Sequence, residues 1–327
     1  MKLLILSDRG LTKLEPHGDR WRALRLREMA SARALAADPR DAATLYIGTR
    51  GDGAWRSADG GDSWTKLDVP CADVFALAVS GADGRVYAGC EPSHLYVSDD
   101  AGATWSEREG LRQLPSAPTW SFPPRPWTSH VSAIAPHPSQ AGLILVGIEL
   151  GGLMRSEDGG RTWQDHRPGA QRDVHALAWH PSGDGRAYEA GGGGTARSED
   201  HGVSWSPVDA GRDDDYCWGL AVAPGEPETW FASASPSARH AHGDRPARAG
   251  VYRWREDGPW RRVHGGLPDP LDDMPYALAA DEDRVIVGLR SGRLFLSEDL
   301  GGSWRELDVG GARLGGLRQI VIVPATR

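Results

Sequence analysis

The 327-residue sequence lacks several features that mark well-known functional classes. Its 37 Lys and Arg residues are outnumbered by 45 Asp and Glu residues, so it has no overall positive field to hold phosphate backbones. No apolar run approaches the roughly 20 residues that a membrane-spanning helix needs. The N-terminal apolar segment, residues 3–6, is too short for the core of a signal peptide. We therefore expect neither nucleic acid nor a membrane as a partner.

Cysteine is also scarce, with Cys71, Cys90 and Cys217 as the three copies. An odd number cannot form a fully paired disulfide framework, and no two of them lie close in the sequence. We therefore expect all three to be small apolar side chains in the reduced state. Together with the short N-terminal apolar segment, this predicts a cytoplasmic protein, which we expect to be a monomer.

Glycine and proline, by contrast, are abundant, and 42 Gly and 23 Pro residues indicate many short strands joined by tight turns. The motif S-x-D-x-G-x-[ST]-W occurs five times, at residues 57–64, 98–105, 156–163, 198–205 and 297–304. Its Asp can accept backbone N–H groups, its Gly can adopt a positive φ, and its Trp can begin a strand with a large apolar face. The motif therefore predicts a hairpin turn.

The motif is part of a longer repeat with room for four short strands. Seven tryptophans mark it at intervals of 41 to 58 residues: Trp21, Trp64, Trp105, Trp163, Trp205, Trp260 and Trp304. The first repeat lacks its first strand, which residues 318–323 can supply from the other end of the chain. We predict an all-β, seven-bladed β-propeller. We expect residues 1–327 to form one domain in which residues 1–24 and 316–327 share a blade, an arrangement that removes free sheet edges.

Five Asp boxes in this register resemble those of the BNR/Asp-box repeat β-propellers of the sialidase-like superfamily. That grouping includes sialidases, xyloglucan-cleaving glycosidases, sortilin-type receptors and a photosystem II assembly propeller. The resemblance implies the propeller fold along the whole chain. Sialidases also carry an Arg-Ile-Pro signature near the N-terminus, and this sequence lacks it. A sialidase activity is therefore less well supported than the fold.

Two long insertions, about residues 108–130 and 235–249, are predicted to lie on one face of the propeller, opposite the Asp boxes. Loops on that face carry the candidate site. Aligning the repeats places five arginines near the channel mouth: Arg9, Arg33, Arg50, Arg290 and Arg318. Clustered guanidinium groups suit the capture of a carboxylate or phosphate. The alternative is that these arginines pair with nearby carboxylates and only hold the loops together.

The same alignment supplies candidates for proton transfer. Glu91 and Glu149 follow the second strands of adjacent repeats and could form the carboxylate pair of a glycosidase. His175 could act as a general base, and Tyr276 is a further proton-transfer candidate. The alternative is that the two glutamates are ordinary loop carboxylates and that His175 is a satisfied loop residue.

Aromatic residues near the same face could stack on a sugar. They are Trp120 and Trp127 in the first insertion and Trp218 in a later repeat. The second insertion contains His240-x-His242, which lacks a third metal ligand nearby, so we assign no metal and no cofactor.

These observations favour a sialidase-like or glycosidase-like enzyme with hydrolase or lyase chemistry. It would act on an anionic small molecule or glycan at the channel mouth. The alternative is a non-catalytic propeller that docks a protein or peptide partner, in the manner of an assembly factor or receptor.

Overall fold

The computed structural model describes residues 1–122 and 128–323 and is built almost entirely from β-strands. Three short helices interrupt them: η1 (Glu109–Gln113), η2 (Ala117–Thr119) and α1 (Ala238–His242). Among the described residues, no helix is long and apolar enough to cross a membrane. The strands form seven antiparallel sheets, six of four strands and one of three.

The chain divides into two compact units, which are described separately. Unit 1 comprises residues 1–30, 192–195 and 208–327, and its three sheets have the strand orders β27-β1-β2-β3, β19-β20-β21-β22 and β23-β24-β25-β26. Its strands are β1 (Lys2–Ser7), β2 (Gly10–His17), β3 (Arg20–Glu28), β19 (Tyr216–Ala223), β20 (Thr229–Ser235), β21 (Gly250–Arg255), β22 (Arg261–Arg262), β23 (Ala277–Asp281), β24 (Arg284–Gly288), β25 (Leu294–Ser297), β26 (Arg305–Glu306) and β27 (Leu317–Val323).

Unit 2 comprises residues 31–191 and 196–207. Its sheets have the orders β4-β5-β6-β7, β11-β10-β9-β8, β12-β13-β14 and β15-β16-β17-β18. Its strands are β4 (Ala32–Asp38), β5 (Asp41–Thr49), β6 (Ala54–Ser57), β7 (Thr65–Leu67), β8 (Val74–Val79), β9 (Val86–Cys90), β10 (Leu95–Ser98), β11 (Ser106–Glu107), β12 (Val131–Pro136), β13 (Ile144–Ile148), β14 (Gly152–Ser156), β15 (Val174–Trp179), β16 (Ala187–Gly191), β17 (Gly194–Ser198) and β18 (Ser206–Pro207). The first two residues of β17 are assigned to unit 1.

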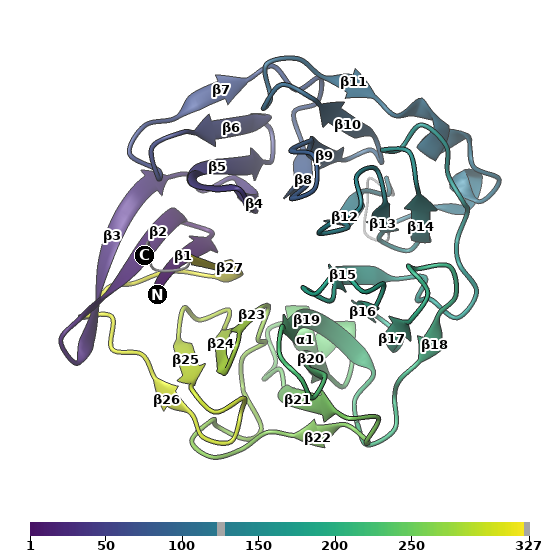
Figure 1. Cartoon of the computed structure of the whole chain (residues 1–327). Helices are drawn as coiled ribbons and strands as arrows, with labels where there is room; N and C mark the ends of the chain where they lie inside the picture. The colour runs from purple at the N-terminus through teal and green to yellow at the C-terminus, as the bar shows by residue number, and fades with distance from the viewer. Residues whose placement is uncertain (123–127, 324–327) are drawn as a thin grey trace. The chain divides into compact units, whose positions relative to one another are not determined.

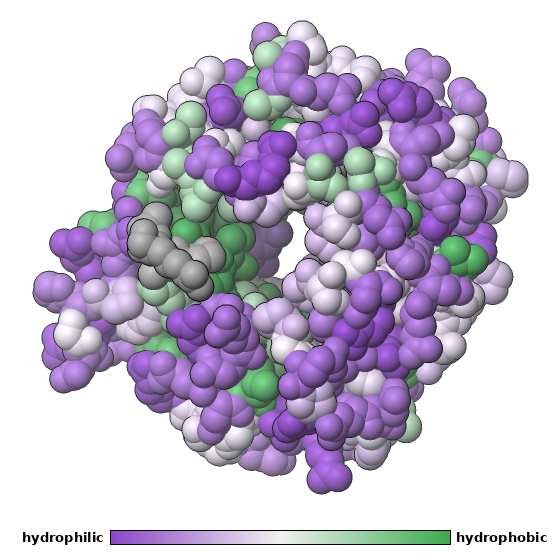
Figure 2. Space-filling model, viewed as in Figure 1, coloured by the Kyte–Doolittle hydropathy of each residue, from purple (hydrophilic) through white to green (hydrophobic). Residues whose placement is uncertain are grey.

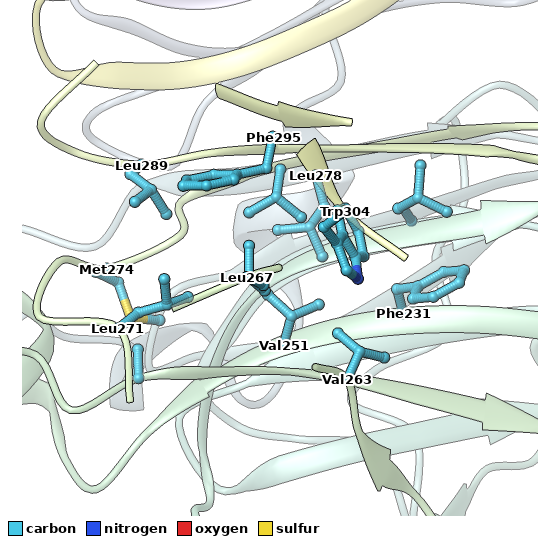
Figure 3. Close-up of a cluster of buried hydrophobic side chains, with 14 of the residues drawn as sticks. Phe231, Val251, Val263, Leu267, Leu271, Met274, Leu278, Leu289, Phe295 and Trp304 are labelled. Atoms are coloured by element: carbon cyan, nitrogen blue, oxygen red, sulfur yellow. The ribbon is translucent and has the colours of Figure 1, made fainter. Parts of the chain in front are cut away.

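Within each unit, neighbouring sheets pack through the first strand of each repeat. In unit 2, β4 contacts β8, β8 contacts β12, and β12 contacts β15. In unit 1, β19 contacts β23, and β23 contacts β27. Apolar side chains fill the space between these sheets. One such cluster in unit 1 combines Phe231, Val251 and Phe295 with Trp304, the Asp-box tryptophan of the next sheet (Figure 3).

The two ends of the chain meet in one sheet of unit 1. Strand β27 lies beside β1, with Ile320 opposite Ile5 and Val323 opposite Lys2 (Figure 1). Leu317 and Ile320 join Leu3 and Ile5 in a buried cluster. The predicted fold class is therefore confirmed: the chain is an all-β, seven-bladed β-propeller whose N- and C-terminal segments share a blade.

All five Asp boxes form the same hydrogen-bonded turn. In the first, Asp59 Oδ1 accepts the Ser57 hydroxyl at 2.7 Å and the Ser63 N–H at 2.9 Å. Ser57 Oγ in turn accepts the Gly61 N–H at 2.8 Å, and Trp64 Nε1 donates to the Gly61 carbonyl at 2.9 Å. Gly61 has φ +99°, a conformation that suits glycine. The Asp and Ser bonds recur in all five boxes, and the tryptophan bond recurs at Trp105 and Trp205. Trp163 and Trp304 differ, because their Nε1 atoms are buried without a hydrogen-bond partner among the described residues. The box turns the chain after the third strand of its repeat.

The expectation of three reduced cysteines is wrong for two of them. Cys71 and Cys90 form a disulfide with a Cα–Cα distance of 6.6 Å, and Cys217 is free and buried. The partners are 19 residues apart, but β8 and β9 pair so that Cys90 lies opposite Val74, close to the loop that holds Cys71. Sequence separation concealed this proximity because strand pairing created it. Disulfides are more typical of oxidising compartments than of the cytoplasm.

Hydrophilic residues cover most of the face shown in Figure 2. Among the described residues, Val203 is the large apolar residue that is classed as exposed, at 39%. The apolar side chains are otherwise used between and within the sheets, so polar loop residues carry the candidate site.

Candidate functional site

Arg50, Glu91 and Glu149 occupy equivalent positions in three successive sheets of unit 2. Each comes directly after the second strand of its sheet, β5, β9 or β13. Each donates its backbone N–H to the residue just before the first strand: Arg50 to Ser31 O, Glu91 to Asp73 O, and Glu149 to His130 O. The same bond in unit 1 joins Asp8 to Gly316, so Asp8 rather than Arg9 holds the equivalent backbone position there.

A second group of candidate side chains lies at β-bulges, where one residue of the first strand has no partner on the second strand. In four sheets of unit 2, the register of the first strand shifts around one residue, and the residues inside these shifts are Arg33, Phe75, Ser132 and His175. A bulge redirects the side chain of its extra residue, and bulges are enriched beside active sites. In unit 1, the corresponding shift spans Trp218 and Gly219.

Arg33 and Arg50 bring two positive charges together. Burial lowers the pKa of Arg33, the nearby charge of Arg50 lowers it further, and Asp73 acts in the opposite direction. Arg33 Nη1 is buried and has no hydrogen-bond partner among the described residues. Arg50 lies 3.8 Å from Glu91 Oε2, and its guanidinium carbon is 5.8 Å from the centre of the Phe75 ring. Glu91 therefore compensates the positive charge of Arg50 only through one long ion pair.

Glu91 and Glu149 have different partners. Glu91 Oε1 accepts the Thr128 hydroxyl at 2.6 Å, and the Glu91 side chain is 10% exposed. Glu149 Oε2 lies 2.8 Å from His130 Nε2. The His130 ring packs on Phe75 and Phe122, with centroid distances of 4.4 and 5.1 Å. Phe75 thus contacts both the His130 ring, which pairs with Glu149, and the guanidinium group of Arg50, which pairs with Glu91.

His175 lies beside two carboxylates at the edge of the same region. Its Nε2 is 3.5 Å from Asp173 Oδ2, and its side chain is 1% exposed. One ligand atom each from Glu149, Asp173 and His175 lies within 4.8 Å of the other two. The sequence pointed to Glu149 and His175 but not to Asp173 or His130. The signal for His130 was its place directly before a first strand, where its carbonyl accepts the Glu149 N–H.

In unit 1, the candidate residues Trp218 and Tyr276 form an aromatic cluster with His242. Tyr276 donates its hydroxyl proton to Ala241 O at 2.7 Å and lies 2.7 Å from His242 Nδ1. His242 Nε2 lies 2.7 Å from the Tyr216 hydroxyl, and Trp218 packs edge-on to the His242 and Tyr276 rings. Burial raises the pKa of Tyr276 to about 12. Tyr276 is therefore held as a neutral hydrogen-bond donor.

Two of the unit 1 arginines, Arg290 and Arg318, act on the same residue, because the charge of each opposes the effect of burial on the pKa of Tyr276. Arg290 is exposed and directs Nη1 at the His242 and Gly243 carbonyls, at 3.4 and 3.5 Å. The positive charge of Arg318 lowers the pKa of Tyr276, although the effect of burial is larger. Arg9 and Arg313 line a cavity of about 410 Å³ whose wall includes leucine, valine and alanine side chains. This cavity could hold the carboxylate of a partly apolar molecule.

The first insertion is only partly described. Trp120 donates Nε1–H to Ser116 Oγ at 3.0 Å and packs against the apolar cluster that contains Ile148. Trp120 is thus fixed by its neighbours, and the predicted stacking role stays untested. Trp127 lies outside the described residues. In the second insertion, His240 contacts Ser237 whereas His242 contacts the two tyrosines, so these histidines have separate partners.

Comparisons with known proteins agree with this architecture. Residues 96–107 match the BNR/Asp-box repeat model. The chain is a seven-bladed β-propeller with BNR/Asp-box repeats. It is 25% identical to a xyloglucanase of Hypocrea jecorina over 62% of this chain and 27% of that enzyme. It is 23% identical to an oligoxyloglucan-reducing end-specific xyloglucanase of Emericella nidulans over 84% of this chain and 40% of that enzyme.

Solved structures show the same fold. The GH74 xyloglucanase from Xanthomonas campestris has a TM-score of 0.70 and 20% identity, covering 97% of this chain and 52% of that chain. A structure of YCF48 bound to D1 peptide has a TM-score of 0.62 and 16% identity, covering 91% of this chain and 88% of that chain. The chain thus spans 27% and 40% of the two curated xyloglucanases, and 88% of the YCF48 chain.

Proposed function

We propose that this propeller is a glycosidase-like hydrolase that acts on a glycan at the edge of unit 2 containing Glu91 and Glu149. The observation that carries the proposal is the equivalent placement of these two carboxylates after the second strands of adjacent sheets. Glycoside cleavage needs such a pair, one as general acid and one as nucleophile or base. The similarity to xyloglucanases supports a glycan as the substrate class.

The partners of the two carboxylates suggest different roles. Glu91 accepts a hydrogen bond from the Thr128 hydroxyl and lies 3.8 Å from Arg50, so we assign it the role of nucleophile or base. Glu149 is oriented by His130, whose ring is fixed between Phe75 and Phe122, and we assign it to the opposite side of the scissile bond. The partly buried rings offer flat apolar surface for a sugar.

The finer part of the proposal is that the glycan carries a negative charge. Arg33 and Arg50 repel each other, and Arg33 Nη1 has no hydrogen-bond partner among the described residues. A carboxylate of the substrate would reduce the repulsion between the two arginines and would accept a hydrogen bond from Arg33 Nη1. Uronic or sialic acid units fit this requirement.

The test is release of reducing ends from xyloglucan oligosaccharides and from oligosaccharides that contain uronic or sialic acid. We expect Glu91→Gln and Glu149→Gln each to lower kcat/KM by about 10²- to 10⁴-fold. The matched control is Glu107→Gln, because Glu107 also pairs with a histidine, His94 at 2.7 Å, but lies on β11. The proposal would be contradicted if the wild-type protein turned over none of these glycans, or if Glu91→Gln and Glu149→Gln kept the wild-type kcat/KM.

A second candidate function is the docking of a peptide or protein without catalysis. The cavity of unit 1 favours it, because Arg9 and Arg313 lie beside apolar wall residues and the Glu306 carboxylate in the same wall pairs with Arg293. A peptide with a free carboxylate and an apolar side chain fits that chemistry. In a thermal-shift screen, such peptides would stabilise the protein, amidated peptides would not, and Arg9→Ala would abolish the shift.

A further inference from the structure

We propose that Glu149, Asp173 and His175 bind a divalent transition-metal ion of the zinc class. One ligand atom from each lies within 4.8 Å of the other two. Three different parts of unit 2 supply them: the end of β13, the loop before β15, and the bulge inside β15. Zinc bonds of about 2.0–2.2 Å place ligand atoms roughly 3.5 Å apart, so the three ligand atoms have to approach one another on binding.

The donor set selects among cations. Imidazole nitrogen and carboxylate oxygen together suit zinc, cobalt, nickel or manganese, whereas calcium and magnesium prefer oxygen ligands. The His175 side chain is 1% exposed, and those of Glu149 and Asp173 are 13% and 23% exposed. Water therefore reaches the site from the carboxylate side. Three protein ligands leave a coordination position open to that water or to an oxygen of a bound molecule.

A second observation, the environment of Asp173, also favours a cation at this site. Asp173 Oδ1 is buried and has no hydrogen-bond partner among the described residues. Two carboxylates within 4.8 Å also repel each other unless a positive charge lies between them. A metal ion satisfies both requirements.

Neighbouring groups hold the ligands in place. His130 Nε2 lies 2.8 Å from Glu149 Oε2 and orients that carboxylate. Ser132 donates its hydroxyl to Val174 O at 2.6 Å, which anchors the backbone between Asp173 and His175. Such contacts to ligating residues commonly fix the geometry of metal sites. The sequence concealed the site because Glu149 is more than 20 positions from the other two ligands.

This inference goes beyond the proposed hydrolase function and does not depend on it. When a metal ion binds Glu149, that carboxylate is a ligand and is no longer free for proton transfer. Metal binding and hydrolysis are therefore measured separately, and hydrolysis is assayed with and without a chelator. A protein that binds metal but cleaves no glycan would contradict only the hydrolase proposal.

The experiment uses untagged full-length protein that has been stripped with a chelator. Zinc is titrated in by calorimetry, and cobalt by its visible absorption, which reports coordination by nitrogen and oxygen. We expect one zinc per chain, a rise in Tm on loading, and no response to calcium or magnesium. His175→Gln and Asp173→Asn should each weaken zinc binding by at least tenfold.

Two control variants make the outcome specific. His94→Gln removes a histidine that also pairs with a carboxylate, Glu107 at 2.7 Å, and it should bind zinc as the wild type does. His240→Gln with His242→Gln tests the H-x-H segment and should also leave binding unchanged. Equal zinc affinity in the wild type, His175→Gln and Asp173→Asn would overturn the assignment, as would the absence of stoichiometric binding. Because Asp173 lies in a loop, its variant remains informative if His175→Gln fails to fold.

Discussion

At the scale of single residues, Glu189 is placed where a carboxyl group is rarely found. It lies on β16 with 0% of its surface exposed. Its Oε2 accepts the Gln171 N–H at 2.9 Å, whereas Oε1 has no hydrogen-bond partner among the described residues. Burial raises the pKa of Glu189 from 4.5 to about 8, and the bond from Gln171 only partly opposes this. Glu189 is thus protonated in the folded protein at neutral pH.

The raised pKa has a definite consequence for stability. Between about pH 4.5 and 8, the folded protein keeps a proton on Glu189 that the unfolded chain has released. The contribution of Glu189 is therefore fully present below pH 4.5 and is lost as the pH rises toward 8. Glu189→Gln retains the size and an acceptor oxygen without ionising, so we expect it to raise the free energy of unfolding at pH 8 by about 1–3 kcal/mol.

The measurement is urea unfolding of both proteins at pH 5 and pH 8, and the gain should be smaller at pH 5. Glu107→Gln is the matched control, because although burial raises the pKa of Glu107, hydrogen bonds from Arg112 and His94 outweigh that effect and lower it. This variant should lose stability at pH 8. Equal stability of Glu189→Gln and the wild type at pH 8 would refute the assigned protonation state.

Aligning the repeats could predict only those site residues whose position recurs from one repeat to the next. Alignment of the repeats identified Arg33 and His175, because the bulge recurs at the same place in each first strand. It could not identify His130, Asp173 or Glu189. His130 and Asp173 lie directly before a first strand, which is a recurring position. The roles of the three side chains nevertheless depend on burial and on contacts between separate loops, and these do not recur from one repeat to the next.

At the scale of elements, the Asp box is a turn whose Asp carboxylate accepts hydrogen bonds from backbone N–H groups and hydroxyl groups of the same turn. Hydrogen bonds from Ser63 and Ser57 lower the pKa of Asp59 to about 2, and equivalent bonds do the same for Asp100. For Asp299, bonds from the Ser303 backbone and from Ser297 have this effect. The carboxylate form is therefore the one that holds each turn. Because the motif is local, its structure could be predicted from the sequence alone.

Asp158→Ala removes this acceptor from the third box. Asp158 Oδ1 accepts the Thr162 N–H at 2.9 Å and the Ser156 hydroxyl at 2.9 Å, and both donors would lose their partner. We expect the free energy of unfolding to fall by about 1–3 kcal/mol, measured by urea titration. Asp62→Ala in the first box is the control, because Asp62 is exposed and is not at the acceptor position. Asp158→Ala should leave kcat/KM of the folded protein unchanged, and a loss of activity at full folding would place the box in the site.

At the scale of the whole molecule, the fold was predictable because seven similar repeats with one incomplete member require that the chain ends complete each other. The pairing of β1 with β27 is the result. The disulfide between Cys71 and Cys90 could not be predicted in the same way, since it occurs in one repeat only. The substrate, the catalytic role of the candidate residues and the cellular compartment stay predictions, because they depend on features that the repeat does not encode.

Deleting residues 317–327 tests how much the shared blade contributes to stability. The deletion removes β27, which pairs with β1 along its length and buries Leu317 and Ile320 against Leu3 and Ile5. Loss of two buried aliphatic residues and an inner strand should lower Tm by roughly 10 °C or more. The exposed edge of β1 should also promote association, visible by light scattering. A synthetic peptide of residues 316–327 should bind that edge, raise Tm with increasing peptide concentration and return the light scattering to that of the intact protein. A scrambled peptide should do neither, and a truncated monomer with the wild-type Tm would show that the shared blade contributes little to the fold.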